Sequence, residues 1–197
     1  MSILFGLLFA ASASAASFDA GTHYTVIGEE STAEPVVMEF FSYGCGGCFV
    51  FDAWFQRMKA EIGDGVDVEY VPVDFGGGFW TPTQELFLVM DALKLRDALH
   101  DDAFRFIHDE RNRPTADNMK KFLARHGVTE EKYEKTAESF PVHVKKRRYD
   151  QLTRRYGTSS TPTVIVNGRY QVNQAALSGP AQFVELVQYL LKNPAPN

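Results

Sequence analysis

The sequence predicts an α/β fold into which an all-helical segment is inserted. Three observations lead to this expectation: strand and helix patterns alternate between residues 35 and 78, helical patterns fill residues 82–156, and strand patterns return after Gly157. A strand, a helix and a second strand in that order favour a parallel βαβ unit. The 197 residues, 45% of them hydrophobic and 23% charged, are enough for one domain with a large insertion.

Composition and charge exclude several classes of protein. The hydrophobic share is that of an ordinary globular chain and not that of a disordered or collagenous one. Because 20 basic residues stand against 25 acidic ones, the net charge of -5 disfavours nucleic acid as a partner, which would favour a basic domain. The sequence contains two cysteines. This number is too small for a disulfide-stapled miniprotein or a four-cysteine zinc site.

Residues 1–16 are expected to form a signal peptide. They contain no charged side chain, and the apolar run at residues 3–11 is too short to span a bilayer. Ala13 and Ala15 then provide the small residues of a cleavage site. The alternative is a buried first helix, but its alanines and serines would bury little apolar surface. The signal peptide predicts export into an oxidising compartment, in which disulfides persist.

The first part of the α/β domain is expected to span residues 17–81. Residues 36–41 form a mostly apolar run, as is typical of a strand that is buried on both faces. A Ser-Tyr-Gly segment ends this strand, and the residues that follow Cys48 can form a helix as far as Met58. Residues 66–71 alternate between apolar and polar side chains, which predicts a second strand.

The all-helical insertion is expected to span residues 82–156. Thr81 is predicted to cap its first helix, with Pro82 in the first helical position and Gln84 completing a capping box. From Leu86 onward, apolar side chains recur at the spacing of one helix face. The segment therefore begins with a predicted amphipathic helix.

Further helices are predicted within the insertion. Residues 117–126 place apolar side chains on one face and end at Gly127, a common helix stop. Another helix is predicted to start at Thr129, to be interrupted at Pro141 and to resume as far as Gly157.

Residues 157–197 are expected to complete the α/β domain. Residues 163–166 and 169–172 both have strand character, and the Asn-Gly pair between them is a strong hairpin signal. An amphipathic helix is predicted over residues 180–191.

The two cysteines, Cys45 and Cys48, lie three residues apart at the predicted start of a helix. Their sulfurs can therefore close a small disulfide or open to a dithiol. Cys45 meets unpaired backbone N–H groups and the positive end of the helix dipole, which stabilise a thiolate. This predicts that Cys45 attacks and that Cys48 resolves the mixed disulfide. Gly46 and Gly47 give the turn freedom but supply no side-chain charge.

Two other interpretations of the cysteine pair are an inert structural disulfide and half of a zinc site completed by histidines. A disulfide across four residues would constrain little chain entropy. The five histidines show no metal-ligand spacing, and none lies close to the cysteines in sequence. We therefore expect no metal, and papain-like catalysis by Cys45 with a distant histidine is not favoured. The redox interpretation is preferred.

Motifs along nearly all of the remaining chain follow one order. They are Tyr24-Thr25, Glu39-Phe40-Phe41-Ser42, the CxxC motif, Phe75-Gly76-Gly77-Gly78, the helical block, and Pro162 followed by Val166 to Val172. This colinear set resembles the DsbA family of periplasmic thiol:disulfide oxidoreductases. The resemblance implies a thioredoxin-like fold with an inserted all-helical domain, a periplasmic location, and a redox-active Cys45–Cys48 disulfide without a further cofactor.

The resemblance also implies roles for individual residues. Cys45 would be the exposed nucleophile and Cys48 its buried partner. Pro162 matches the family's cis-proline beside the disulfide, where the adjacent backbone, including Thr161, pairs with a substrate peptide in strand fashion. Glu39 matches a buried acid beneath the active site, where a carboxylate can relay a proton to the inner thiol. The alternative for Glu39 is a polar residue that the strand merely tolerates.

Three features depart from the family's pattern. Gly46-Gly47 stand where the well-studied oxidases usually carry Pro-His, whose histidine helps to hold the thiolate. Tyr70 stands where a lysine often accompanies the buried glutamate. Thr161 stands where many oxidases have valine, and threonine at this position also occurs in isomerase relatives. The reaction class survives these changes, whereas the redox strength is left open.

Two aromatic residues, Phe79 and Trp80, are candidates for substrate binding. Together with Phe75 they lie among glycines, which is unusual for a solvated loop. They can form the floor of an apolar substrate groove beside the active site. Packing into the core is an equally supported alternative.

These features together predict an enzyme, an exported thiol:disulfide oxidoreductase that donates its Cys45–Cys48 disulfide to unfolded secreted proteins. The resemblance implies a DsbB-type membrane quinone reductase as the partner that reoxidises it. One alternative is a disulfide reductase or isomerase, and another is a non-enzymatic peptide-binding or holdase module with a structural disulfide. Against an isomerase of the dimeric kind, the stretch before Tyr24 leaves no room for a dimerisation domain. We expect a monomer.

Overall fold

A mixed sheet with a parallel βαβ unit at one edge organises the molecule. The computed structural model describes residues 18–192, and the expected signal peptide lies outside them. The strands are β1 (Tyr24–Val26), β2 (Val36–Phe41), β3 (Asp67–Pro72), β4 (Thr163–Val166) and β5 (Tyr170–Val172). Their order in the sheet is β1-β5-β4-β2-β3. β2 and β3 are parallel and are connected by α1 (Gly46–Glu61), whereas the other neighbours are antiparallel. The α/β prediction is confirmed.

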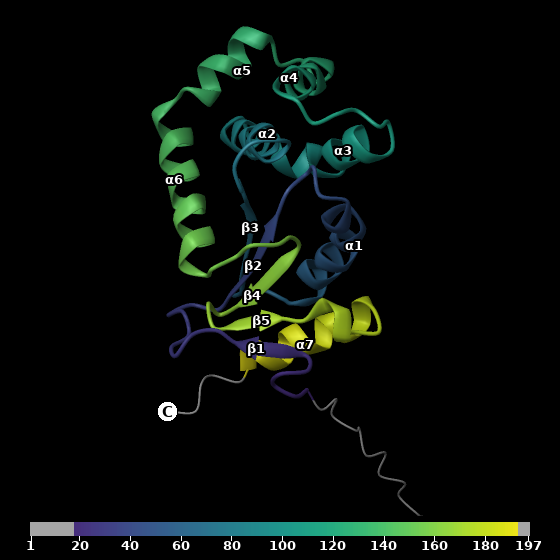
Figure 1. Cartoon of the computed structure of the whole chain (residues 1–197), viewed down its shortest axis with the longest axis vertical. Coiled ribbons are helices and arrows are strands. Elements are labelled where there is room, and N and C mark those ends of the chain that lie inside the picture. The colour runs from purple at the N-terminus through teal and green to yellow at the C-terminus, as the bar shows by residue number, and fades with distance from the viewer. Residues whose placement is uncertain (1–17, 193–197) are drawn as a thin grey trace, which may run out of the picture.

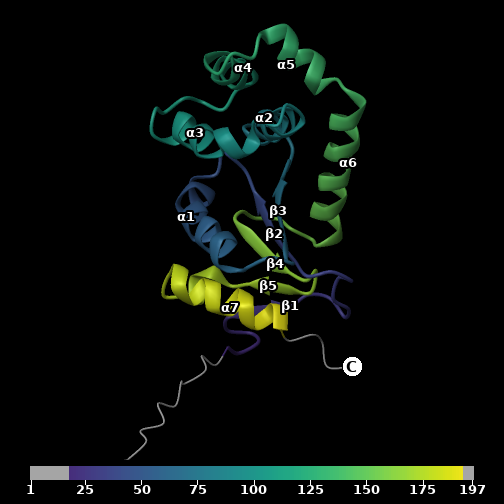
Figure 2. The ribbon, with the colours of Figure 1, turned by 180° about the vertical axis from the view of Figure 1, so that it is seen from behind.

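Helices cover both faces of this sheet. α1 and α7 (Pro180–Lys192) pack together on one face, and α6 (Phe140–Arg155) runs along the other (Figures 1 and 2). Residues 37–41 of β2 are all buried. The unbroken apolar pattern of β2 follows from this arrangement, because a strand covered on both faces has no solvent side.

The helices between β3 and β4 gather beyond one end of the sheet (Figure 1). They are α2 (Trp80–Ala92), α3 (Arg96–His108), α4 (Ala116–Arg125) and α5 (Glu130–Ala137), and α6 leads from them back along the sheet. Thr129 caps α5 as predicted, with its hydroxyl accepting from the Lys132 amide at 3.2 Å. Gly127 takes a positive φ of 81° just after α4, and Pro141 lies in the first turn of α6. The helix end predicted at Gly127 and the helix start predicted at Thr129 are therefore confirmed, whereas the interruption predicted at Pro141 lies earlier, between Ala137 and Phe140.

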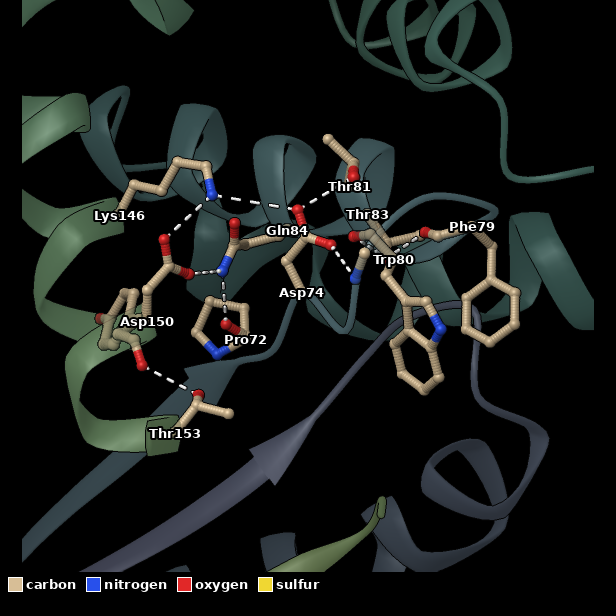
Figure 3. Close-up of polar contacts among 12 residues, drawn as sticks. Pro72, Asp74, Phe79, Trp80, Thr81, Thr83, Gln84, Lys146, Asp150 and Thr153 are labelled. Atoms are coloured by element: carbon tan, nitrogen blue, oxygen red, sulfur yellow. Dashed lines mark hydrogen bonds and ion pairs between the residues drawn. The ribbon is translucent and has the colours of Figure 1, made fainter. Parts of the chain in front are cut away.

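The predicted capping box at the start of α2 is wrong. α2 begins at Trp80, and its N-cap residue is Phe79, which makes no side-chain cap. The Thr81 hydroxyl instead donates to Asp74 at 2.9 Å. The buried Gln84 amide donates to the Pro72 carbonyl and to Asp150, each at 3.0 Å (Figure 3). Partners distant in sequence thus replace the local cap, and Gln84 connects the end of β3 to α6.

The hairpin between β4 and β5 turns at the predicted Asn-Gly pair. Asn167 and Gly168 have φ values of 52° and 64°, which is the left-handed region that this type of turn requires. β4 pairs with β2 such that Thr163 lies opposite Phe40. The residues just before β4 therefore lie beside the chain that leaves β2 toward the two cysteines.

No helix within residues 18–192 combines the length and the apolar character needed to cross a membrane.

Candidate active site

Cys45 is the N-cap residue of α1, directly after the buried strand β2 and its short turn. Its backbone is extended, with φ -88° and ψ 114°, and its sulfur accepts a hydrogen bond from the Cys48 amide at 3.2 Å. A sulfur in this position faces the unpaired amides and the positive end of the helix dipole. The sequence prediction that the helix N-terminus stabilises a Cys45 thiolate matches this geometry.

The two sulfurs have different environments. The hydrogen bond from the Cys48 thiol has the largest effect on the pKa of Cys45 and lowers it, whereas burial, the second-largest effect, raises it. Further hydrogen bonds from the Thr161 side chain and from the amides of Cys48 and Gly47 bring the pKa of Cys45 down to about 6. Burial, followed by the interaction with Cys45, raises the pKa of the Cys48 thiol. Cys45 is half-buried and Cys48 is fully buried. Cys45 is thus the accessible, readily ionised thiol and Cys48 the inaccessible one.

Thr161 and Pro162, which precede β4, lie against the CxxC turn. The peptide bond between them is cis. The Thr161 carbonyl lies 3.6 Å from the Cys45 sulfur. A Cβ atom added at Gly47 would lie 3.3 Å from Pro162 Cδ and 3.7 Å from the Cys45 sulfur, whereas one at Gly46 would meet no atom within 4 Å. The structure therefore brings Thr161, Pro162 and Gly47 together around Cys45 and leaves Gly46 facing outward.

The aromatic residues at the start of α2 border the same turn. A Cβ at Gly44 would lie 2.3 Å from the Phe79 ring, so only glycine allows this close approach. The rings of Phe79 and Trp80 lie side by side with centroids 4.3 Å apart (Figure 3). Phe75 packs edge-on against Trp80. Phe79 and Trp80 are half-buried. They fill space beside the active-site turn and also keep apolar surface exposed there.

Glu39 lies beneath the cysteines in the middle of β2. It is 1% exposed, and its Oε2 atom has no hydrogen-bond partner. Burial, together with the charges of Asp52 and Cys45, raises the pKa of the Glu39 carboxyl well above its usual range. A carboxyl group held in its acid form at this position can give a proton to the buried Cys48 or take one from it.

A second group of polar side chains lies below the cysteines and was missed in the sequence. His100, from α3, bonds to Asp52 of α1 and to the Tyr43 hydroxyl. His108, also from α3, bonds to the Tyr43 carbonyl at 2.8 Å and stacks on Phe49. The position of Asp52 could have been predicted, because Asp52 follows Cys48 by four residues and so lies on the same face of the helix. The histidines gave no such signal, since their partners lie far away in the sequence.

Within the described part of the chain, no cluster of three or more His, Cys, Asp and Glu side chains could hold a metal ion. The reactive groups that the site does bring together are two thiols, a helix N-terminus and a buried carboxyl. This set can perform thiol–disulfide exchange, in which an accessible thiolate attacks and a buried thiol closes the ring.

Replacing Glu39 by glutamine is expected to stabilise the folded protein, and to do so more strongly as the pH rises. The pKa of Glu39 is higher in the folded state than in the unfolded state. The stability that the neutral carboxyl contributes is therefore fully present below the unfolded-state pKa. It is lost as the pH rises through the folded-state pKa. Glutamine stays neutral, so we expect a gain of about 1–3 kcal/mol at pH 8 and a smaller gain at pH 5.

Chemical denaturation at both pH values measures this difference, with Glu30→Gln as the matched control because Glu30 is exposed. A Glu39→Gln gain that is the same at pH 5 and pH 8 would contradict the assignment of a buried, neutral carboxyl.

Comparison with known proteins agrees with this chemistry. A family model described as Thioredoxin matches residues 21–188. The thiol:disulfide interchange protein DsbA of Pseudomonas aeruginosa is 31% identical over 199 residues, which cover 94% of this chain and 90% of that protein. DsbA of Pseudomonas syringae pv. tomato is 31% identical over 193 residues, with coverage of 93% and 88%.

Solved structures show the same similarity. A crystal structure of Pseudomonas aeruginosa DsbA has a TM-score of 0.78 at 27% identity, covering 89% of this chain and 93% of that chain. DsbA from Klebsiella pneumoniae has a TM-score of 0.80 at 26% identity, covering 91% and 100%. The similarity in sequence and in structure extends over almost the whole of each chain.

Proposed function

The chain belongs to the thioredoxin-fold family of DsbA thiol:disulfide interchange proteins and is a protein disulfide oxidoreductase, and from this premise we propose that it works as an oxidase. In the proposed reaction, the Cys45–Cys48 disulfide is passed to an unfolded secreted protein. The substrate loses two electrons and two protons as its dithiol becomes a disulfide, and the enzyme disulfide becomes a dithiol. The redox-active disulfide is the only redox group that this reaction needs.

The environment of Cys45 is the observation that favours oxidation of the substrate over its reduction. Its pKa is lowered to about 6, so the reduced protein carries a stabilised thiolate at neutral pH. Stabilising the reduced form makes the disulfide a stronger oxidant. A reductase would instead require that the disulfide be the more stable form.

The surface around Cys45 suits an extended substrate. Backbone groups at Thr161 and Pro162 are proposed to pair with the substrate chain in strand fashion, a mode that tolerates many sequences. The exposed parts of Phe79 and Trp80 would contact apolar side chains of the same substrate. Unfolded proteins offer both features, because their backbone and their apolar residues are accessible.

The cellular setting is proposed to be the periplasm, reached through residues 1–16 as a signal peptide. After each transfer the enzyme is reduced, so a second partner must remove two electrons from Cys45 and Cys48. A DsbB-type membrane quinone reductase is proposed as this partner, as the resemblance to the family implies.

Oxidation of a synthetic peptide with two cysteines tests the proposed direction. The oxidised protein is expected to form one peptide disulfide for each protein molecule reduced, as measured by mass spectrometry after acid quenching. Its equilibrium with glutathione is expected to favour the reduced protein. Reduction of insulin without peptide oxidation would indicate a reductase or isomerase, and failure in both assays would indicate a peptide-binding or holdase module.

A further inference from the structure

Asp52 places a second carboxylate beneath the Cys45–Cys48 pair. It lies four residues after Cys48 on α1, which puts both side chains on the same helix face, about 6 Å apart along the axis. The charge of Asp52 is one of the causes that raise the pKa of Glu39. Any negative charge that forms on Cys48 therefore develops near two acidic side chains, and a nearby positive charge would compensate for it.

His100 is the group that meets Asp52. Its Nε2 atom lies 3.0 Å from Asp52 Oδ1, its Nδ1 atom lies 2.9 Å from the Tyr43 hydroxyl, and its side chain is 6% exposed. The Tyr70 hydroxyl also reaches Asp52, at 3.5 Å, and the Tyr70 ring centre lies 4.6 Å from that of His100. Among residues 18–192, neither lysine nor arginine forms an ion pair with Asp52 or Glu39.

Tyr70 is the neighbour of Glu39 on the adjacent strand, and it cannot carry a positive charge. It pairs with Glu39 across the parallel strands β2 and β3, so the two side chains share one face of the sheet. This is the position where the sequence departs from the family by lacking a lysine. A tyrosine in this position is polar but brings no positive charge. Among the described residues, the side chain that bonds to Asp52 and can become cationic is His100.

The surroundings allow His100 to exchange protons with water. It borders a polar pocket of about 310 Å³. The charged groups that line this pocket are Lys59 of α1 and Arg96, Asp97 and Asp101 of α3. The remaining neighbours of the ring are aromatic, with Phe41 of β2 and Phe104 of α3 at ring distances of 5.8 and 5.3 Å.

We propose that His100, contributed by the helical insertion, is a positioning residue that supplies a titratable positive charge to the acidic cluster under the active-site disulfide. The rate of disulfide transfer then depends on the protonation of His100. This inference rests on the proposed function, since it concerns the step in which Cys48 leaves.

The step is a thiol–disulfide exchange. A substrate thiolate attacks the Cys45 sulfur, a bond forms between these two sulfurs, and the Cys45–Cys48 bond breaks with its electron pair on Cys48. Cys48 then takes a proton from the neutral Glu39 carboxyl, which regains one from water. Negative charge grows on Cys48 in the transition state, so an imidazolium at His100 accelerates the step and a neutral imidazole does not.

The test compares wild type with His100→Gln, which keeps a hydrogen-bond donor toward Asp52 but cannot be charged. The attacking thiol is 2-mercaptoethanol, and its adduct with the oxidised protein is measured by mass spectrometry after acid quenching between pH 5 and pH 8. Because the ionisation of the thiol is common to both proteins, it cancels in the ratio of their rates. We expect wild type to be about three- to tenfold faster at pH 5, with the ratio falling to a plateau at pH 8.

The matched control is His126→Gln, which makes the same change at an exposed histidine of the insertion and is expected to give a ratio near one at every pH. A ratio of wild type to His100→Gln that does not vary with pH would assign His100 a purely structural role and overturn the proposal.

His100→Asn provides a second test if His100→Gln does not fold, because asparagine is also polar and cannot be charged. The ratio of the wild-type rate to the His100→Asn rate is expected to fall between pH 5 and pH 8 in the same way. A ratio that does not vary with pH would overturn the proposal. Failure of the proposed function would be distinguishable, because wild type would then transfer no disulfide to the two-cysteine peptide at any pH.

Discussion

Replacing Cys48 by alanine is expected to stop the exchange reaction half-way and to leave substrate bound to Cys45 through a mixed disulfide. Cys45 is half-buried and ionises readily, whereas Cys48 is fully buried and its pKa is raised by burial. Without Cys48 the mixed disulfide has no internal thiol to resolve it. Cys45→Ala leaves only the buried thiol, so we expect at least about a hundredfold less trapped substrate in this variant.

Each variant is mixed with protein or peptide thiols and a mild oxidant, and the complexes are measured on non-reducing gels and by mass spectrometry. Both variants are expected to lose catalytic oxidation of the two-cysteine peptide. Melting curves control for folding, since each substitution removes one small side chain. Equal trapping by the two variants would show that both sulfurs are accessible and would overturn the assignment of Cys45 as the nucleophile.

Much of the fold could be predicted because its signals are local. The strand over residues 36–41 is marked by its apolar run, the caps at Thr129 and Gly127 mark helix ends, and the Asn-Gly pair marks a hairpin. The error at Gln84 has the opposite cause. Its amide bonds to Pro72 and Asp150, one of which lies 66 residues away, and such tertiary partners cannot be read from a local capping pattern.

Part of the site could also be predicted from local signals. Both cysteines were identified from their spacing. Glu39 was identified from the resemblance to the DsbA family, which includes the motif at residues 39–42. His100 was missed because its bonds to Asp52 and Tyr43 join residues 48 and 57 positions apart. α3, which carries His100, was not predicted as a separate helix. Its buried positions Leu99, Ala103, Phe104 and Ile107 recur at helical spacing, so a local signal for this helix was present in the sequence and was not used.

The Gly46-Gly47 pair is the clearest departure from the relatives, and the structure shows which groups bond to the Cys45 sulfur without a histidine. The Cys48 thiol, the Thr161 side chain and the amides of Cys48 and Gly47 bond to the Cys45 sulfur. The well-studied oxidases carry a histidine between their cysteines as a further donor. The imidazole donor itself is absent, so we expect this protein to oxidise less strongly than its Pro-His relatives.

Gly47→His is therefore expected to lower the pKa of Cys45 below its value of about 6 and to raise the reduction potential. A Cβ at this position lies 3.7 Å from the Cys45 sulfur, within reach for an imidazole donor, and 3.3 Å from Pro162 Cδ, which must give slightly. One hydrogen bond to a charged group contributes about 1.5–3 kcal/mol. Since about 1.4 kcal/mol corresponds to 30 mV for a two-electron couple, the potential should rise by about 30–60 mV.

Gly47→Ala is the matched control, because it introduces the same Cβ contact with Pro162 without a hydrogen-bond donor. The Cys45 thiolate is titrated by its ultraviolet absorbance in wild type and in both variants, and the potential is taken from the equilibrium with glutathione. Only the histidine variant is expected to shift both quantities, because only it adds a donor to the sulfur. If the pKa of Cys45 fails to fall in Gly47→His, the backbone amides already saturate the sulfur and the missing histidine does not limit the oxidising strength.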